Sequence, residues 1–158
     1  MTLASETLKS FAAVMNGASP QAHALGIVTV GFETDVAILK TPYRLELVGD
    51  PDTGVIAGGV VTTLLDHASG QAVFSALGQP TSIATLDLRI DYMRAAEPGL
   101  DLFCRAHCYK ITRSVAFVRA SAYERDAEDP VATAQAAFML NSNAGRRPGA
   151  NLAAEKRS

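Results

Sequence analysis

The residues best suited to chemistry are Ala57-Gly58-Gly59 and Asp66, which lies eight residues after Gly58. Apolar residues at helical spacing run from this point to Leu77, so the glycines fall in the first turn of a predicted helix. The first N–H groups of a helix have no partner within it and lie at the positive end of its dipole. Because glycine lets a ligand approach closely, this helix end suits a carbonyl oxygen that gains negative charge during attack.

Asp66 is the candidate catalytic carboxylate. Its neighbours three and four residues away are all small: Thr62, Thr63, Ser69 and Gly70. A carboxylate on such a face suits a partly buried cleft, as general base towards water or as nucleophile on an acyl carbon. His67 points about 100° away around the helix, which favours a packing role.

Gly58 and Asp66 are about 12 Å apart along the helix axis, too far for both to act on one carbonyl. If two antiparallel copies of the helix pack across a twofold axis, Gly58 of one chain approaches Asp66 of the other. The sequence therefore predicts a homodimer with two equivalent sites. Whether dimers pair into a homotetramer is left open.

The rest of the chain predicts the elements that position this helix. Residues 5–15 have the spacing of a short docking helix, and residues 25–41 predict a strand bent at Gly31. Four strands follow the long helix, at about 81–94, 100–108, 115–124 and 131–141. In the first of them the even positions from Ala84 to Tyr92 are apolar and are expected to pack. The fold class is α+β, an antiparallel sheet with one face covered by the central helix.

Length and composition limit the function classes. The 158 residues fit a single domain, predicted as 1–143, with 144–158 as a loose tail. A net charge of -2 gives no general attraction for nucleic acid or an anionic membrane, and no signal or spanning segment is seen, so we expect a cytoplasmic protein. Cys104 and Cys108 lie about 13 Å apart on one strand, which favours two buried thiols over a disulfide or a metal site.

Residues 20 to 140 resemble the hotdog-fold thioesterases, particularly the phenylacetate-pathway type. In that family His-Gly-Gly opens the central helix, an acid follows eight residues after the first glycine, and a strand then ends in Tyr-x-Arg-like sequence. This chain has Gly58-Gly59, Asp66 and the stretch Thr85 to Arg94 in that order. The resemblance implies a hotdog fold and hydrolysis of an acyl-CoA thioester without a metal or redox cofactor. Gly58 would polarise the carbonyl, and Asp66 would be the catalytic carboxylate.

Seven further residues are expected at the substrate site. Three begin the helix, two on the next strand are placed to assist the carboxylate, and two arginines suit the coenzyme phosphates. In that order they are Ala57, Gly59, Thr62, Ser82, Thr85, Arg94 and Arg113.

Two positions depart from the family pattern. Ala57 stands where the family has His, and Pro51 lies near the place where relatives often have Asn or Gln. These departures keep a non-catalytic acyl-CoA binding protein as the alternative. A hotdog hydratase or dehydratase is less favoured, because no acid and histidine pair of the required kind is visible.

Overall fold

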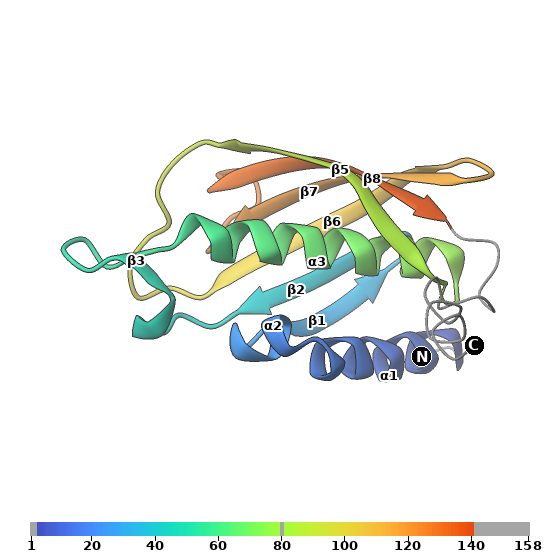
Figure 1. Ribbon diagram of the computed structural model, residues 1–158, viewed down its shortest axis with the longest axis horizontal. Helices are drawn as coiled ribbons and strands as arrows, with labels where there is room; N and C mark the ends of the chain where they lie inside the picture. The colour runs from blue at the N-terminus through green and yellow to red at the C-terminus, as the bar shows by residue number, and fades with distance from the viewer. Residues whose placement is uncertain (1–2, 80, 141–158) are drawn as a thin grey trace, which may run out of the picture.

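The structure is a computed structural model that describes residues 3–79 and 81–140. Its main sheet is built from six antiparallel strands: β1 (Val28–Glu33), β2 (Val36–Thr41), β5 (Ile83–Tyr92), β6 (Leu102–Ile111), β7 (Val115–Tyr123) and β8 (Ala132–Leu140). Their order across the sheet is β1-β2-β6-β7-β8-β5, with α3 (Gly58–Leu77) lying along one face (Figure 1). The predicted α+β hotdog fold is confirmed. The predicted tail from residue 144 lies outside the described residues.

The central helix α3 spans the residues predicted for it. Gly78 ends it in the left-handed conformation, at φ 66°, which glycine adopts without strain. The sheet beneath the helix is lined by short side chains, because Ala106, Ala120 and Ala134 stand opposite one another on β6, β7 and β8. This row lets the larger buried side chains of α3, including Leu64 and Leu65, pack directly onto the sheet.

The predicted N-terminal docking helix is present and longer than expected. It forms α1 (Leu3–Ala18), followed by the short α2 (Pro20–Ala24), and lies along β1 (Figure 1). The Phe11 ring meets Phe74 of α3 edge to face, with ring centroids 5.1 Å apart. Between α2 and the sheet's first strand the chain keeps Ile27 buried.

Residues 25–41 form a hairpin, so the prediction of one bent strand was wrong. β1 and β2 are joined by the two-residue turn Thr34-Asp35, in which Asp35 has φ 60°. Aspartate is one of the few residues besides glycine that adopts this conformation readily. The register does shift between Thr29 and Gly31, where the bend was expected.

β5 contains a bulge at Leu86 that the predicted alternation lacked. Ile83 packs inward before the bulge, and Leu88 and Ile90 pack inward after it, so the buried face changes from odd to even positions. Leu86 itself is exposed. The prediction that the even positions pack was therefore wrong for the first half of the strand.

Smaller elements complete the fold. The 3-10 helix η1 (Leu45–Leu47) and the hairpin of β3 (Val48–Asp50) and β4 (Val55–Ile56) lead into α3. Cys104 and Cys108 are buried free thiols, as predicted, and burial raises the pKa of both. Among the residues described, no helix is long and apolar enough to cross a membrane.

Candidate active site

The N-terminal end of α3 is open. Ala57 is the N-cap residue and supplies no side-chain hydrogen bond to the helix. Gly58 and Gly59 are exposed, and a Cβ atom added at Gly59 would meet no described atom within 4 Å. The first N–H groups of the helix can therefore donate to an incoming oxygen, which is the role that the sequence leads us to expect for Gly58.

The segment before α3 is held by backbone contacts. Ala57 N donates to Leu47 O at 2.9 Å. Gly49 lies so close that a Cβ atom there would be 2.8 Å from Ala57 Cα. Pro51, near the position where the family often has Asn or Gln, is exposed in the turn between β3 and β4. The helix end is thus placed by η1 and the small hairpin, without a polar side chain at position 57.

Tyr92, at the end of β5, contacts the first turn of α3. Its hydroxyl Oη donates to Gly58 O at 2.8 Å, and Thr62 Oγ1 lies 3.0 Å from the same Oη. Thr62 was predicted to bind substrate, and its hydroxyl is here bonded to Tyr92. From the sequence, Tyr92 was assigned to the packed face of the strand and to its Tyr-x-Arg-like end but to no role at the site, because nothing in the local pattern shows a contact between residues 34 positions apart.

Asp66 is half-buried and faces β5. Thr85 Oγ1 donates to Asp66 Oδ1 at 3.0 Å, so Thr85 lies beside the carboxylate as the sequence predicted. Ser82 is exposed three residues earlier, about 10 Å further along the strand. Of the two hydroxyl residues predicted to assist Asp66, the structure brings Thr85 to it and leaves Ser82 away from it.

His67 belongs to a polar network on the opposite side of α3 from β5. Its Nε2 lies 2.8 Å from Asn16 Oδ1, which also accepts from Gln71 Nε2 at 2.8 Å. Because an amide oxygen only accepts, His67 Nε2 carries a proton. Burial lowers the pKa of His67, although the charge of Asp66 acts in the other direction. The neutral ring packs α3 against α1, in agreement with the packing role predicted for it.

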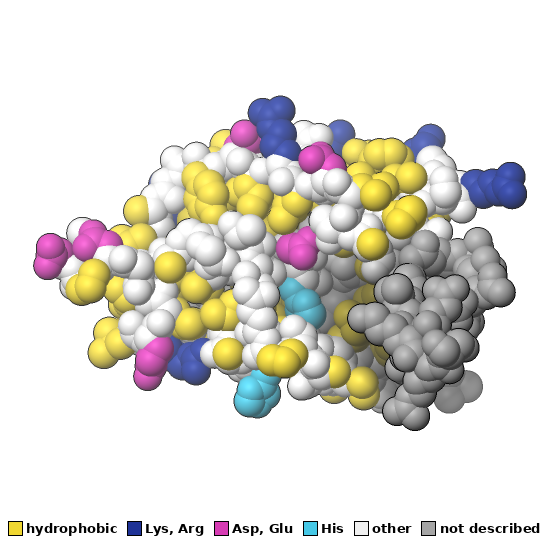
Figure 2. All heavy atoms as spheres, viewed as in Figure 1, with side chains coloured by type: hydrophobic (Ala, Val, Ile, Leu, Met, Phe, Trp, Pro, Cys, Tyr) yellow, Lys and Arg dark blue, Asp and Glu magenta, His cyan; other side chains and the backbone are white. Residues whose placement is uncertain are grey.

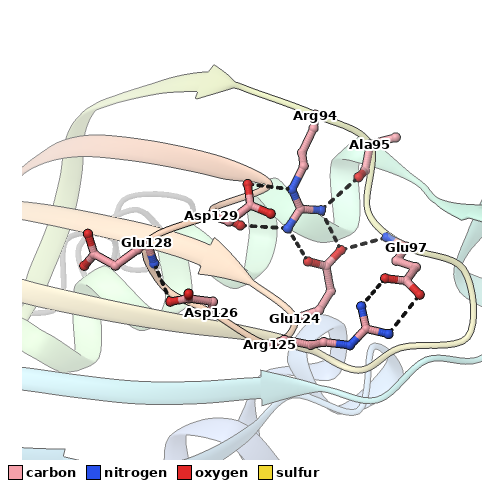
Figure 3. A network of polar contacts seen from close by, with 8 residues as sticks. All are labelled: Arg94, Ala95, Glu97, Glu124, Arg125, Asp126, Glu128 and Asp129. Atoms are coloured by element: carbon pink, nitrogen blue, oxygen red, sulfur yellow. Dashed lines mark hydrogen bonds and ion pairs between the residues drawn. The ribbon is translucent and has the colours of Figure 1, made fainter.

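Arg94 lies in an ion-pair cluster that joins the end of β5 to the turn between β7 and β8 (Figure 3). Its guanidinium donates to both carboxylate oxygens of Glu124, at 3.1 and 2.6 Å, to Asp129 Oδ1 and O, and to Ala95 O. These five bonds use all five N–H donors of an arginine side chain. Hydrogen bonding to Glu124 raises the pKa of Arg94. Arg94 therefore holds this corner of the fold together, and in this structure its N–H donors are engaged within the protein and not turned to the phosphate contact expected of it.

Arg113 lies at the other end of the sheet. It is exposed in the turn between β6 and β7, beside Ser114, whose carbonyl accepts a bond from Leu140 N. Leu140 is opposite Ile83 at the start of β5, whereas Arg94 follows the end of β5. The two arginines of one chain are thus too far apart to hold the same phosphate group.

Comparisons with known proteins agree with this architecture. Residues 53–130 match the family described as the Thioesterase superfamily. A Pseudomonas aeruginosa protein of known structure is 35% identical over 86% of this chain and 98% of its own, with a TM-score of 0.75. The Escherichia coli PaaI protein, from the phenylacetic acid degradation operon, has a TM-score of 0.75 at 18% identity, over 87% of this chain and 95% of its own. At that identity the likeness concerns the fold alone.

A curated Halobacterium salinarum protein, provisionally named an esterase, is 42% identical over 65 residues, which make up 39% of this chain and 43% of that protein. The chain thus spans less than half of this curated relative. An antiparallel sheet packed on a central helix, with two glycines at the helix start and a carboxylate eight residues further along the same helix, is the arrangement of a hotdog-fold scaffold. With the family match and the 35% identical relative, the chain belongs to the thioesterase superfamily. Membership supports thioester hydrolysis as its general chemistry.

Proposed function

We propose that this protein hydrolyses acyl-CoA thioesters as a homodimer, with Gly58 of one protomer and Asp66 of its partner acting on one carbonyl. One observation carries the proposal: both residues lie on the side of α3 that faces β5. Gly58 contacts Tyr92, and Asp66 contacts Thr85, both from that strand. A twofold axis along this side would place both groups in one cleft.

The β5 edge supports pairing with a second copy. β5 is the last strand of the sheet, and Leu86, Tyr92 and Met93 are 54%, 52% and 63% exposed. Hydrophobic side chains gather over this strand on the face shown in Figure 2. β5 leaves an open edge of ten residues, on which the exposed Leu86 and Tyr92 stand among charged side chains, and such an edge is available for pairing with another strand.

The contacts along β5 indicate the register of this pairing. If two copies of β5 pair antiparallel with the twofold axis at Arg89, so that Arg89 faces its own copy, Thr85 of one strand stands opposite Tyr92 of its partner, because the bulge at Leu86 takes one residue out of the count. The residues that these two side chains contact, Asp66 and Gly58, then also approach each other across the axis. A single twofold axis thus satisfies the strand pairing and the site together.

The chemistry follows from the two groups. The thioester carbonyl oxygen would accept N–H bonds at the start of α3, where the helix dipole favours the negative charge that develops on it. Thr85 holds one oxygen of Asp66 and leaves Asp66 Oδ2 to take a proton from water or to attack the acyl carbon. In the first route the C–S bond then breaks, the proton held by Asp66 passes to the leaving sulfur, and the acid and the coenzyme thiol are released. In the second route water hydrolyses the mixed anhydride formed at Asp66 and supplies the proton of the thiol. Arg113 remains the predicted contact for a coenzyme phosphate.

An acyl-CoA binding protein without turnover is the second candidate. The observation in its favour is the helix start, where Ala57 has no polar side chain to orient a thioester or a water molecule. The half-buried Asp66 favours hydrolysis, because a binding role alone gives no reason to hold a carboxylate in the cleft.

Thiol release from short, medium, long and aryl acyl-CoAs tests the proposal, with Asp66→Asn as the paired variant. We expect turnover by the unaltered protein and a fall of at least about a hundredfold in the variant, because general base catalysis contributes about 10²–10⁴-fold. Coenzyme binding without turnover on every substrate would favour the binding protein instead.

A further inference from the structure

Two hydroxyl groups form a directional chain that ends at the first turn of α3. Tyr92 Oη donates its single proton to Gly58 O at 2.8 Å. Thr62 Oγ1 lies 3.0 Å from Tyr92 Oη, so the proton between those two oxygens must come from Thr62. The hydrogen bonds therefore run in one direction, from Thr62 to Tyr92 and from Tyr92 to the carbonyl of Gly58.

The carbonyl at the end of this chain belongs to the same planar peptide unit as Gly59 N–H. A hydrogen bond accepted by the carbonyl oxygen polarises the unit and makes its N–H a stronger donor. Gly59 is exposed, and space for a Cβ atom is open there among the described residues. The strengthened N–H is thus free of side-chain cover at the end of the helix.

A parallel path leads to Gly58 N–H through the backbone. Thr63 Oγ1 donates to Gly59 O at 2.9 Å, which polarises the peptide unit that carries Val60 N–H. Val60 N in turn donates to Ala57 O at 3.0 Å, in the peptide unit of Gly58 N–H. Each of the first two N–H groups of α3 is therefore polarised, directly or through one further peptide unit, by a hydroxyl side chain that donates to a backbone carbonyl. The N-cap residue contributes no such side chain.

We infer that Tyr92 and Thr62 are positioning residues that strengthen Gly59 N–H as a second donor to the thioester oxygen, beside Gly58 N–H. The catalytic part of this inference rests on the proposed function. The polarisation itself is a property of the folded protein and can be measured without substrate.

Kinetics of Tyr92→Phe, Thr62→Val and the double variant test the catalytic part. We expect Tyr92→Phe to lower kcat about three- to tenfold with KM unchanged, less than the loss of a whole oxyanion donor. Thr62→Val should lower kcat about twofold alone and have no further effect in the Tyr92→Phe background, since it acts only through Tyr92. The matched control is Tyr109→Phe, whose ring lies over Arg119 on another strand. The inference is overturned if Thr62→Val lowers kcat by the same factor with and without Tyr92→Phe. It is also overturned if kcat falls only in proportion to the amount of folded protein.

The amide proton shift of Gly59 in the ¹⁵N-labelled homodimer tests the polarisation separately. It should move upfield in Tyr92→Phe, less in Thr62→Val, and not at all in Tyr109→Phe. An unmoved Gly59 signal overturns the inference even if the enzyme is active. A moved signal in a protein that hydrolyses no thioester would instead overturn the proposed function and leave the polarising contact standing.

Discussion

Thr85 Oγ1 donates a 3.0 Å hydrogen bond to Asp66 Oδ1, and the bulge at Leu86 is what makes this contact possible. Leu88 and Ile90 set the inward face of β5 beyond the bulge. In a regular strand continuing that alternation, Thr85 would point to the other face of the sheet. The inserted residue turns Thr85 towards α3, where it orients the carboxylate.

Thr85→Val should lower kcat about tenfold and leave KM nearly unchanged. The substitution keeps the side-chain shape and removes a hydrogen bond to a charged group, and such a bond contributes about 1.5–3 kcal/mol. Steady-state kinetics with the best acyl-CoA substrate checks this, with Thr133→Val on β8 as the control. A Thr85→Val enzyme with unaltered kcat would show that the contact does not serve the reaction.

The register inferred for the dimer places Arg89 next to its own copy across the twofold axis. Arg89→Cys should therefore form an intermolecular disulfide under mild oxidation, because directly opposed residues of antiparallel strands lie within disulfide range. Met93→Cys, exposed on the same segment but about 27 Å from its copy in this register, is the control. Non-reducing electrophoresis reads the result. Crosslinking of Met93→Cys but not Arg89→Cys would mean a different register.

Glu124→Gln should lower the free energy of unfolding by about 1.5–3 kcal/mol without changing kcat per folded molecule. The Glu124 side chain is only 3% exposed and receives two bonds from Arg94, so the loss of its charge weakens the cluster in Figure 3. Urea denaturation measures the change, and the exposed Glu128→Gln is the control. A variant that is fully stable but has lost activity would return Arg94 to a role in substrate binding.

The same carboxylate gives a pH dependence. Burial acts to raise the pKa of Glu124, but the bonds and charge of Arg94 and the bond from Glu97 N–H together outweigh it and hold the pKa below the ordinary 4.5. The contribution of Glu124 to stability is therefore present above pH 4.5 and is lost as the pH falls through the lowered value. The stability difference between the unaltered protein and Glu124→Gln should shrink in that range.

His67 should make the protein less stable as the pH falls below neutrality. Burial lowers its pKa from the ordinary 6.5, so the unfolded chain binds the proton more readily than the folded protein does. The stability from the neutral ring is present above pH 6.5 and declines as the pH falls towards the lowered value. Melting temperatures at pH 7.5 and 5.5 should differ more for the unaltered protein than for His67→Gln. His107→Gln, at an exposed position on β6, is the matched control substitution.

The sequence predicted the features that depend on local patterns. The span of α3 follows from its helical period and from Gly78, and the Gly58 to Asp66 spacing gives the site its outline. The hairpin turn at Thr34-Asp35 was missed because it contains no glycine or proline, although Asp35 is a residue type that accepts its conformation.

Features that depend on contacts distant in sequence were not predictable. The bonds from Arg94 to Glu124 and Asp129 join residues 30 and 35 positions apart. The residues next to an arginine at a strand end do not show whether acidic side chains lie near it in the folded protein. The bulge at Leu86 adds one residue to an otherwise regular apolar alternation, so the pattern alone gave the wrong face for Thr85.

The central claim is that each site takes Gly58 from one protomer and Asp66 from the other, and subunit complementation tests it most directly. Gly58→Pro removes the N–H donor at the first helical position, where proline is tolerated and where Ala57 already has ψ 137°. Gly58→Ala keeps that N–H and is the control. Gly58→Pro and Asp66→Asn should each be inactive alone. Refolded together in equal amounts they should regain about one quarter of the unaltered activity, because half of the dimers are mixed and each mixed dimer has one intact site. Mixed dimers that stay inactive, although they form, would contradict a site shared between protomers.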